Sequence, residues 1–173
     1  FSKIIEYSFN LSKFTLTTMP KGKMAAFYLK TEGGKVVDSG VDAARAGTTM
    51  EVKELFFNTP ARLKFMKSEA VELRHIIDVI TKYALMNYGV SFKLINEGNI
   101  LINSPGSNDW KNAIAAVYGV NLAKEMLEIN YNSENIKVKG YIAKPYQARN
   151  DKNQQALFVN GRWVKNDDVI KAV

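Results

Sequence analysis

The distribution of apolar and polar positions divides the chain into a strand-rich beginning and a remainder that mixes helices and strands. In the first part, β-branched and aromatic residues gather in short runs separated by Gly- and Pro-containing turns, at residues 14–18, 24–31, 35–37 and 49–57. Such runs indicate strands, and we expect a β-meander with a flexible stretch over 40–47. Pro60 ends the last run because it lacks a backbone N–H, so a short helical turn is expected over 61–66.

The clearest helical period lies at residues 69–88. Ser68 can cap its start and Gly89 can end it, and the apolar residues recur at the spacing of one helix face: Leu73, Ile76, Ile77, Ile80, Ala84 and Leu85. We expect an amphipathic helix that covers a sheet.

The rest of the chain predicts hairpins and two further helices. Asp109 should cap a helix that Gly119 ends, and Asp167 or Asp168 should cap a last one. Asn160–Gly161 between two apolar runs predicts a type I′ hairpin, since both central residues of that turn need positive φ. The other strands are expected at 90–95, 100–103, 127–131 and 136–142. Without a regular βαβ period, this order predicts an α+β fold with helices on one face of a mostly antiparallel or mixed sheet.

The composition excludes several classes of protein. The 173 residues are 46% apolar, which is enough for a core, and they include no Cys and one His. Disulfide frameworks, thiolate zinc sites and His-rich metal cages are therefore excluded. No apolar stretch approaches the ~20 residues that span a bilayer, so we expect a soluble protein.

The formal charge of +7 suggests a polyanionic partner, although charge alone also fits ordinary solubility. Residues 1–40 and residues 141–173 each carry six basic and three acidic side chains. The excess of basic side chains lies at the two ends of the sequence, and these side chains would form one patch if the fold brings the two ends together.

The most informative stretch is residues 47–65, GTTMEVKELFFNTPARLKF. By residue type it is a strand that starts with hydroxyl side chains, contains an aromatic pair and ends at a Pro, after which solvated cationic side chains follow. It closely resembles the fourth ATP-site motif of the MutL mismatch-repair family, which belongs to the GHKL ATPases. Three further segments resemble MutL patterns: residues 12–18 (SKFTLTT), 140–145 (GYIAKP) and 158–162 (FVNGR). Residues 1–11 fit poorly.

The resemblance implies the end of a GHKL-type α/β sandwich at residues 1–67. A transducer domain, truncated at its C-terminus, would follow at residues 68–173, with a mixed sheet covered by helices and a left-handed βαβ crossover. In the intact protein it implies an ATP-dependent DNA clamp in which ATP binding dimerises the N-terminal regions. The implied partners are DNA and a MutS-type mismatch recognition protein, with no membrane. The implied location is cytoplasmic and DNA-associated, or nuclear in a eukaryote.

The family's catalytic Glu, magnesium-binding Asn and adenine-reading Asp have no counterpart in this sequence, and they are expected upstream. The Glu54/Asn58 and Glu128/Asn132 spacings lie in expected strands, where positions four apart are not one helical turn apart. We therefore assign no catalytic residue, and we expect this chain alone to be inactive and to bind neither ATP nor Mg²⁺.

Carried over residue by residue, Gly47 and Thr48 resemble the family's Gly-Thr pair beside the adenine. Arg162 follows the tight Asn160–Gly161 turn and matches an Arg of the family's DNA-binding groove; otherwise it is a solvated Arg, stacked on Trp163. The neighbouring polar stretch supplies further candidates for phosphate contacts, which are Lys144, Arg149 and Lys152.

Other residues with chemical potential have simpler structural explanations. His75 has no visible ligand or nucleophile partner, and Asp167 and Asp168 suffice as helix caps. The helical aromatics are expected in the core or at its boundary rather than as a base-stacking platform: Tyr83, Tyr88, Trp110 and Tyr118. Two alternatives to the MutL hypothesis remain at this stage, a stand-alone nucleic-acid-binding module and the transducer of another GHKL enzyme such as a type II topoisomerase.

Overall fold

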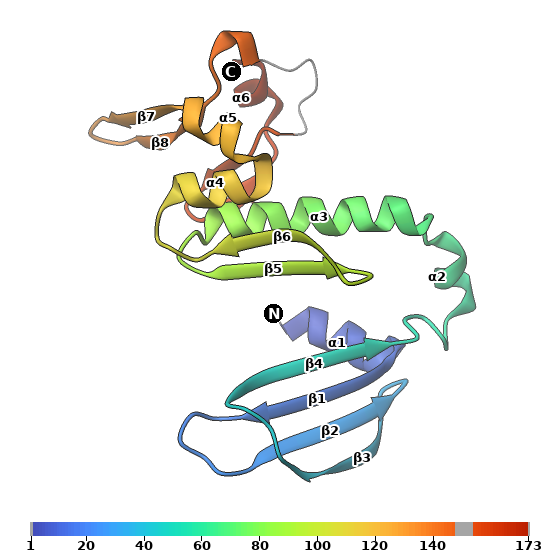
Figure 1. The fold of residues 1–173 in the computed structure, drawn as a ribbon. Helices are drawn as coiled ribbons and strands as arrows, with labels where there is room; N and C mark the ends of the chain where they lie inside the picture. Colours follow the sequence, from blue (N-terminus) through green and yellow to red (C-terminus); the bar gives the residue numbers. More distant parts are fainter. Residues whose placement is uncertain (1, 148–153, 173) are drawn as a thin grey trace. The chain divides into compact units, whose positions relative to one another are not determined.

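The computed structural model describes residues 2–147 and 154–172, and it divides into two compact units, Phe1–Ser68 and Glu69–Val173 (Figure 1). Both units combine helices with antiparallel strands, so the predicted α+β class is confirmed. No helix in the described part of the chain has the length and apolar content needed to cross a membrane.

The first unit contains a four-stranded antiparallel sheet in the order β3-β2-β1-β4. Its strands are β1 (Lys13–Met19), β2 (Ala26–Glu32), β3 (Lys35–Asp42) and β4 (Gly47–Lys53), and the helix α2 (Pro60–Phe65) follows them. β3 extends to Asp42, into the stretch expected to be flexible. β4 ends earlier than expected because Glu54 and Phe56 adopt positive φ values of 51° and 68°, which breaks the extended backbone.

A helix that the sequence did not indicate, α1 (Ser2–Leu11), precedes the sheet and packs on β1 and β2. The backbone N–H of Gly34 donates to the carbonyl of Phe9 at 2.9 Å, which ties the β2–β3 turn to this helix. Phe14 of β1 and Thr31 of β2, which pair across the two strands, have buried side chains. A ten-residue helix is marginal alone, so packing on the sheet defines it rather than propensity.

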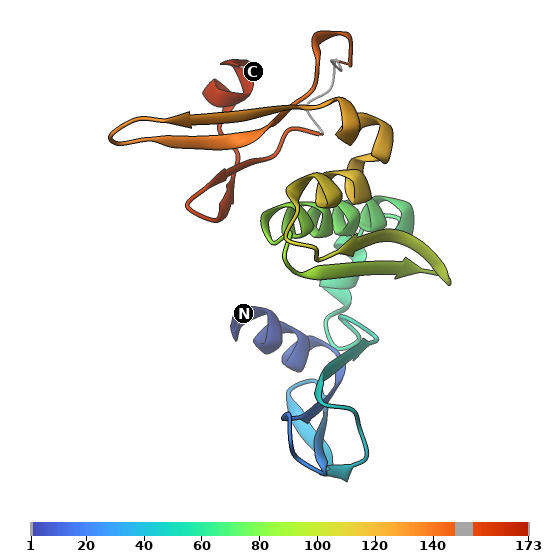
Figure 2. The same ribbon diagram turned by 60° about the vertical axis from the view of Figure 1, so that its left-hand side comes forward.

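In the second unit, the long helix α3 (Glu69–Met86) and a shorter helix lie next to each other, and both pack against a hairpin (Figures 1 and 2). The hairpin is formed by β5 (Ser91–Asn96) and β6 (Asn99–Pro105), and the shorter helix is α4 (Trp110–Tyr118). As predicted, Asp109 caps α4: its Oδ1 accepts from the backbone N–H of Lys111 at 2.9 Å. Gly119 ends the helix, with a φ of 98°.

The core of this unit lies where α3, α4 and the following helix meet. Its buried members are Leu85, Ile114 and Ala123, and Trp110, Tyr141 and Phe158 are among the half-buried side chains that pack on them. The remaining elements are α5 (Val120–Glu125), β7 (Leu127–Asn132), β8 (Lys137–Ile142), η1 (Pro145–Gln147), β9 (Leu157–Val159), β10 (Arg162–Val164) and α6 (Asp167–Ala172).

Two finer expectations differ from the structure. Each strand of the second unit pairs only with its sequence neighbour, as β5–β6, β7–β8 and β9–β10, and all three pairs are antiparallel. Within residues 2–147 and 154–172, therefore, neither a parallel pair nor a βαβ crossover is seen. The cap of α6 is Asn166, whose Oδ1 accepts from the backbone N–H groups of Asp168 and Val169 at 3.0 Å. Asp167 and Asp168 lie in the first turn instead, where the helix dipole favours their charges.

Candidate nucleotide-contacting strand and nucleic-acid interface

Gly47 and Thr48 begin β4, at one edge of the four-stranded sheet, where Thr48 pairs with Thr18 of β1. The two hydroxyl oxygens are 2.9 Å apart, and the Thr18 hydroxyl also lies 3.4 Å from the Gly47 carbonyl oxygen. Thr48 is exposed, and a hydroxyl offers one donor and two acceptor sites, so it keeps capacity for a ligand. Gly47 has a φ of 135°, and a Cβ built there would meet no atom within 4 Å, so the backbone is open to close approach.

The residues that follow β4 form a compact turn that is fastened to the junction of α1 and β1. The backbone N–H of Phe56 donates to the Leu11 carbonyl at 2.6 Å, and the Asn58 amide donates to the Asn10 carbonyl at 3.0 Å. Lys13 forms a 2.7 Å ion pair with Glu54, and this hydrogen bond raises the pKa of the Lys13 ammonium. The motif therefore links β4 to α2, which begins with Pro60 at its first position.

Arg162 is the first residue of β10, directly after the turn. Asn160 and Gly161 have φ values of 49° and 72°, which confirms the predicted type I′ geometry. The Arg162 side chain is exposed, and within the described residues it has no ion pair or hydrogen bond.

The other face of this hairpin is anchored on α3. The Lys82 ammonium lies 3.9 Å from the centre of the Trp163 ring, and the same ammonium pairs with Asp78 one turn earlier on the helix. Phe158, which pairs with Trp163, packs on the core. Since neighbouring strand residues point to opposite faces, anchoring Trp163 directs Arg162 away from α3. The stacking of Arg162 on Trp163 that we considered is replaced by Lys82.

The other cationic candidates are less accessible or lie outside the described residues. Lys144 is half-buried and forms a 3.5 Å ion pair with Glu125, whose carboxylate also accepts a hydrogen bond from Tyr146. A phosphate would have to compete with that carboxylate. Arg149 and Lys152 lie outside the described residues.

The surroundings of His75, Trp110 and Tyr118 fit the structural explanations given for them, whereas those of Tyr83 do not. His75 is exposed on α3, and the described residues contain no group of acidic or His side chains that could hold a metal ion. Trp110 stacks on Tyr88 and meets Tyr141 edge-on, both at 5.8 Å between ring centres. Burial raises the pKa of the Tyr118 phenol to about 12, with a smaller contribution from Asp78. Tyr83, by contrast, is 48% exposed.

The sequence did not indicate which residues contact Thr48 or support the hairpin of Arg162. Thr18 and Lys82 both lie far along the chain from the residues they contact, and nothing in the local sequence marks them. The polar face of the β7–β8 hairpin was also not predicted. The alternation along the two expected strands could have indicated it, because every second residue is polar: Asn130, Asn132, Lys137 and Lys139.

Comparisons with known proteins agree on one family. A family model described as DNA mismatch repair protein, C-terminal domain, matches residues 114–173. The DNA mismatch repair protein MutL of Streptococcus mutans is 41% identical over 157 residues, which are 91% of this chain and 24% of that protein. MutL of Listeria innocua is 37% identical over 164 residues, 95% of this chain and 27% of that protein.

Among solved structures, the Aquifex aeolicus MutL ATPase domain complexed with ADP superposes with a TM-score of 0.81 at 28% identity. That match covers 98% of this chain and 67% of the Aquifex chain. The chain spans about a quarter of the length of the curated relatives it matches. Nothing in these comparisons supports the stand-alone binding module or the topoisomerase transducer. The sequence relationship, which extends over about nine tenths of the chain, places it in the MutL family of DNA mismatch repair proteins.

Proposed function

We propose that this chain forms part of an ATP-dependent DNA clamp that coordinates mismatch repair. Residues 1–67 would complete a GHKL ATPase domain, and residues 68–173 would form most of its transducer. Support comes from the 41% identity to a MutL protein across 91% of the chain. In this proposal ATP binding brings two N-terminal regions together around DNA, a MutS-type protein is a partner, and the protein acts in the cytoplasm on DNA, or in a nucleus.

Gly47 and Thr48 are our candidates for the nucleotide side of the molecule. The Aquifex aeolicus MutL ATPase domain that superposes on this chain was solved with ADP, so a nucleotide is the ligand to test. The exposed Thr48 hydroxyl can donate to or accept from a base or an ordered water, and the open backbone at Gly47 allows close approach. The magnesium-binding Asn of the family has no counterpart in this sequence, so in this proposal the Mg²⁺ ligands belong to other parts of the protein.

Arg162 is our principal DNA contact. The observation that carries this assignment is that its side chain is exposed and forms no ion pair with any residue that the structure describes. A guanidinium can donate two parallel, charge-assisted hydrogen bonds to phosphate oxygens. Lys144, Arg149 and Lys152 are secondary candidates for sequence-independent phosphate contacts.

The test is an equilibrium titration of labelled duplex DNA by fluorescence anisotropy at several salt concentrations, with the complete protein. Arg162→Gln should weaken binding and reduce the salt slope by about 1, because one phosphate contact is lost. Lys93→Gln, an exposed lysine on β5, is the control of equal charge change. If Arg162→Gln binds DNA as the control does, Arg162 is not a DNA contact. Measurable ATP hydrolysis by residues 1–173 alone would contradict the assignment of catalysis to other parts.

A further inference from the structure

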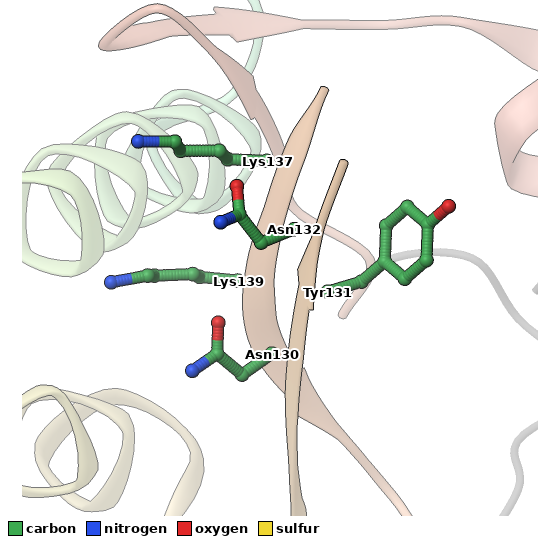
Figure 3. A pocket seen from close by; sticks show the side chains of 5 residues that line it. All are labelled: Asn130, Tyr131, Asn132, Lys137 and Lys139. Carbon is green, nitrogen blue, oxygen red and sulfur yellow. The ribbon is translucent and has the colours of Figure 1, made fainter. Parts of the chain in front are cut away.

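The β7–β8 hairpin has two faces of opposite character. Cross-strand pairing sets Asn130 opposite Lys139 and Asn132 opposite Lys137, so these four side chains share one face. Figure 3 shows all four extending to the same side of the hairpin, while Tyr131 extends to the other. That opposite face is apolar, with Leu127, Tyr131, Val138 and Ile142 on it. The hairpin thus presents a polar face of alternating amides and ammonium groups, which we call the Asn/Lys face.

The Asn/Lys face borders an open depression of about 270 Å³, lined by Asn130, Tyr131, Asn132, Lys137 and Lys139. Among the described residues, neither Lys137 nor Lys139 takes part in an ion pair or a cation–π contact. The hairpin also carries two carboxylates. Glu128 shares the Asn/Lys face, two residues before Asn130 and diagonal to Lys139, but the structure records no ion pair between Glu128 and either lysine, and Glu134 lies in the turn. The two ammonium groups are therefore available to a ligand.

The chemistry of this face suits phosphate groups. A lysine ammonium has three donors and no acceptor, and an Asn amide adds two donors beside it. Lys and Asn side chains are among the groups that supply most hydrogen bonds from proteins to the DNA backbone. Lys137 and Lys139 are two residues apart on one strand, about 6.8 Å along it, so they reach separate phosphates more readily than a single small anion.

The shape of the hairpin points to duplex DNA rather than to a small ligand. β7 and β8 have six residues each, and in both views the pair extends away from α4 and α5 as a narrow ribbon (Figures 1 and 2). A two-stranded ribbon of this kind has the width that a DNA groove admits. The depression is open to solvent on one side and is lined by five residues of this hairpin alone.

We propose that the Asn/Lys face of β7–β8 is a binding site for the phosphate backbone of duplex DNA, separate from Arg162. This inference rests on the proposed function in one respect, namely that the protein binds DNA. It adds a second contact surface to that binding, on a different hairpin.

The test uses the complete protein carrying Lys137→Gln and Lys139→Gln, titrated with labelled duplexes of two unrelated sequences across a range of salt. We expect weaker binding to both sequences and a salt slope smaller by about 2, since each phosphate contact contributes about 0.9. The matched control is Lys93→Gln with Lys124→Gln, which removes the same charge from two exposed lysines elsewhere in the second unit. A second variant, Asn130→Asp with Asn132→Asp, keeps the side-chain shape and should also weaken binding, because donors become acceptors next to the lysines.

The outcomes separate the two DNA proposals. If the Lys137/Lys139 variant and its control lose binding equally, only overall charge matters and the Asn/Lys face is not a site. If Arg162→Gln has no effect while the Lys137/Lys139 variant lowers the slope, the Arg162 assignment fails and the Asn/Lys face stands. If the wild-type protein does not bind duplex DNA, both assignments are wrong. If the Lys137/Lys139 variant and the Asn130/Asn132 variant melt at the same temperature as the wild-type protein, unfolding is excluded as the cause of weaker DNA binding.

Discussion

At the scale of single residues, Tyr118 provides a test of the core that depends on pH. Its phenol is largely buried at the end of α4, and burial raises its pKa to about 12, from an ordinary value of 10. The folded state holds the phenol proton more tightly than the unfolded state, so the protonated phenol adds to the free energy of unfolding. This stabilisation is fully present below about pH 10 and is lost as the pH rises toward 12. A shift of this size corresponds to at most about 3 kcal/mol.

We therefore expect the unfolding free energy of the wild-type protein to fall more steeply between about pH 10 and pH 12 than that of Tyr118→Phe, which lacks the ionisable phenol. Urea denaturation at a series of pH values measures this difference, and absorbance of tyrosinate at 295 nm follows the ionisation itself. Parallel pH profiles for the two proteins would show that Tyr118 ionises as in the unfolded chain. Comparing the pair cancels the titration of the other seven tyrosines among the eight in the sequence.

Local chemistry was enough to locate several residues in advance, but not their partners. The Asn160–Gly161 turn and the Asp109 cap follow from side-chain and backbone preferences over four residues, and the structure has both. The contact of Thr48 with Thr18 depends on strand register, and that of Lys82 with Trp163 depends on tertiary packing. The spacing of residues along the sequence encodes neither contact. Arg162 could therefore be proposed from its turn and from the family resemblance, but Lys82, which contacts its hairpin, could not.

At the scale of elements, Lys82 joins α3 to β10 and so supports the hairpin that carries Arg162. Lys82→Met keeps most of the aliphatic stem and removes the ammonium, and we expect it to lower the unfolding free energy by about 1 kcal/mol. Lys93→Met is the matched control, because Lys93 is exposed on β5 and should tolerate the change. Urea denaturation, followed by the fluorescence of Trp163 in a Trp110→Phe background, gives both values. Equal stability of the two variants would mean that the cation–π contact contributes nothing.

Elements with strong local signals were predictable, and those defined by packing were not. α3, α4 and the hairpins have clear periods and turn residues, so their positions agree with expectation to within a few residues. α1 is held by the sheet beneath it, and α5 continues directly from Gly119, where the sequence indicated only an end. The tie between the turn at residues 54–58 and the α1–β1 junction likewise exists only once α1 is in place.

At the scale of the whole molecule, each unit has its own buried core. In the first unit Phe14 is 3% exposed beneath α1, and in the second Ile114 is 5% exposed at the centre of the α3–α4–α5 cluster. Two separate cores predict two units whose stability can be changed independently. Phe14→Ala should destabilise its unit by about 3–5 kcal/mol, and Ile114→Ala should destabilise its own by about 2–5 kcal/mol.

Hydrogen exchange measured by mass spectrometry can separate these effects along the chain. With Ile114→Ala we expect faster exchange in α3, β6 and α4 and unchanged exchange in β1 and β2, and the reverse with Phe14→Ala. Exposed Val36→Ala, a substitution on β3 outside both cores, is the control that should leave both units unchanged. If either core variant accelerates exchange throughout the chain, the two units unfold together, and the proposed boundary near residue 67 does not separate independently stable domains. Independent behaviour would instead allow the proposed DNA contacts of the second unit to be measured without disturbing β4 of the first.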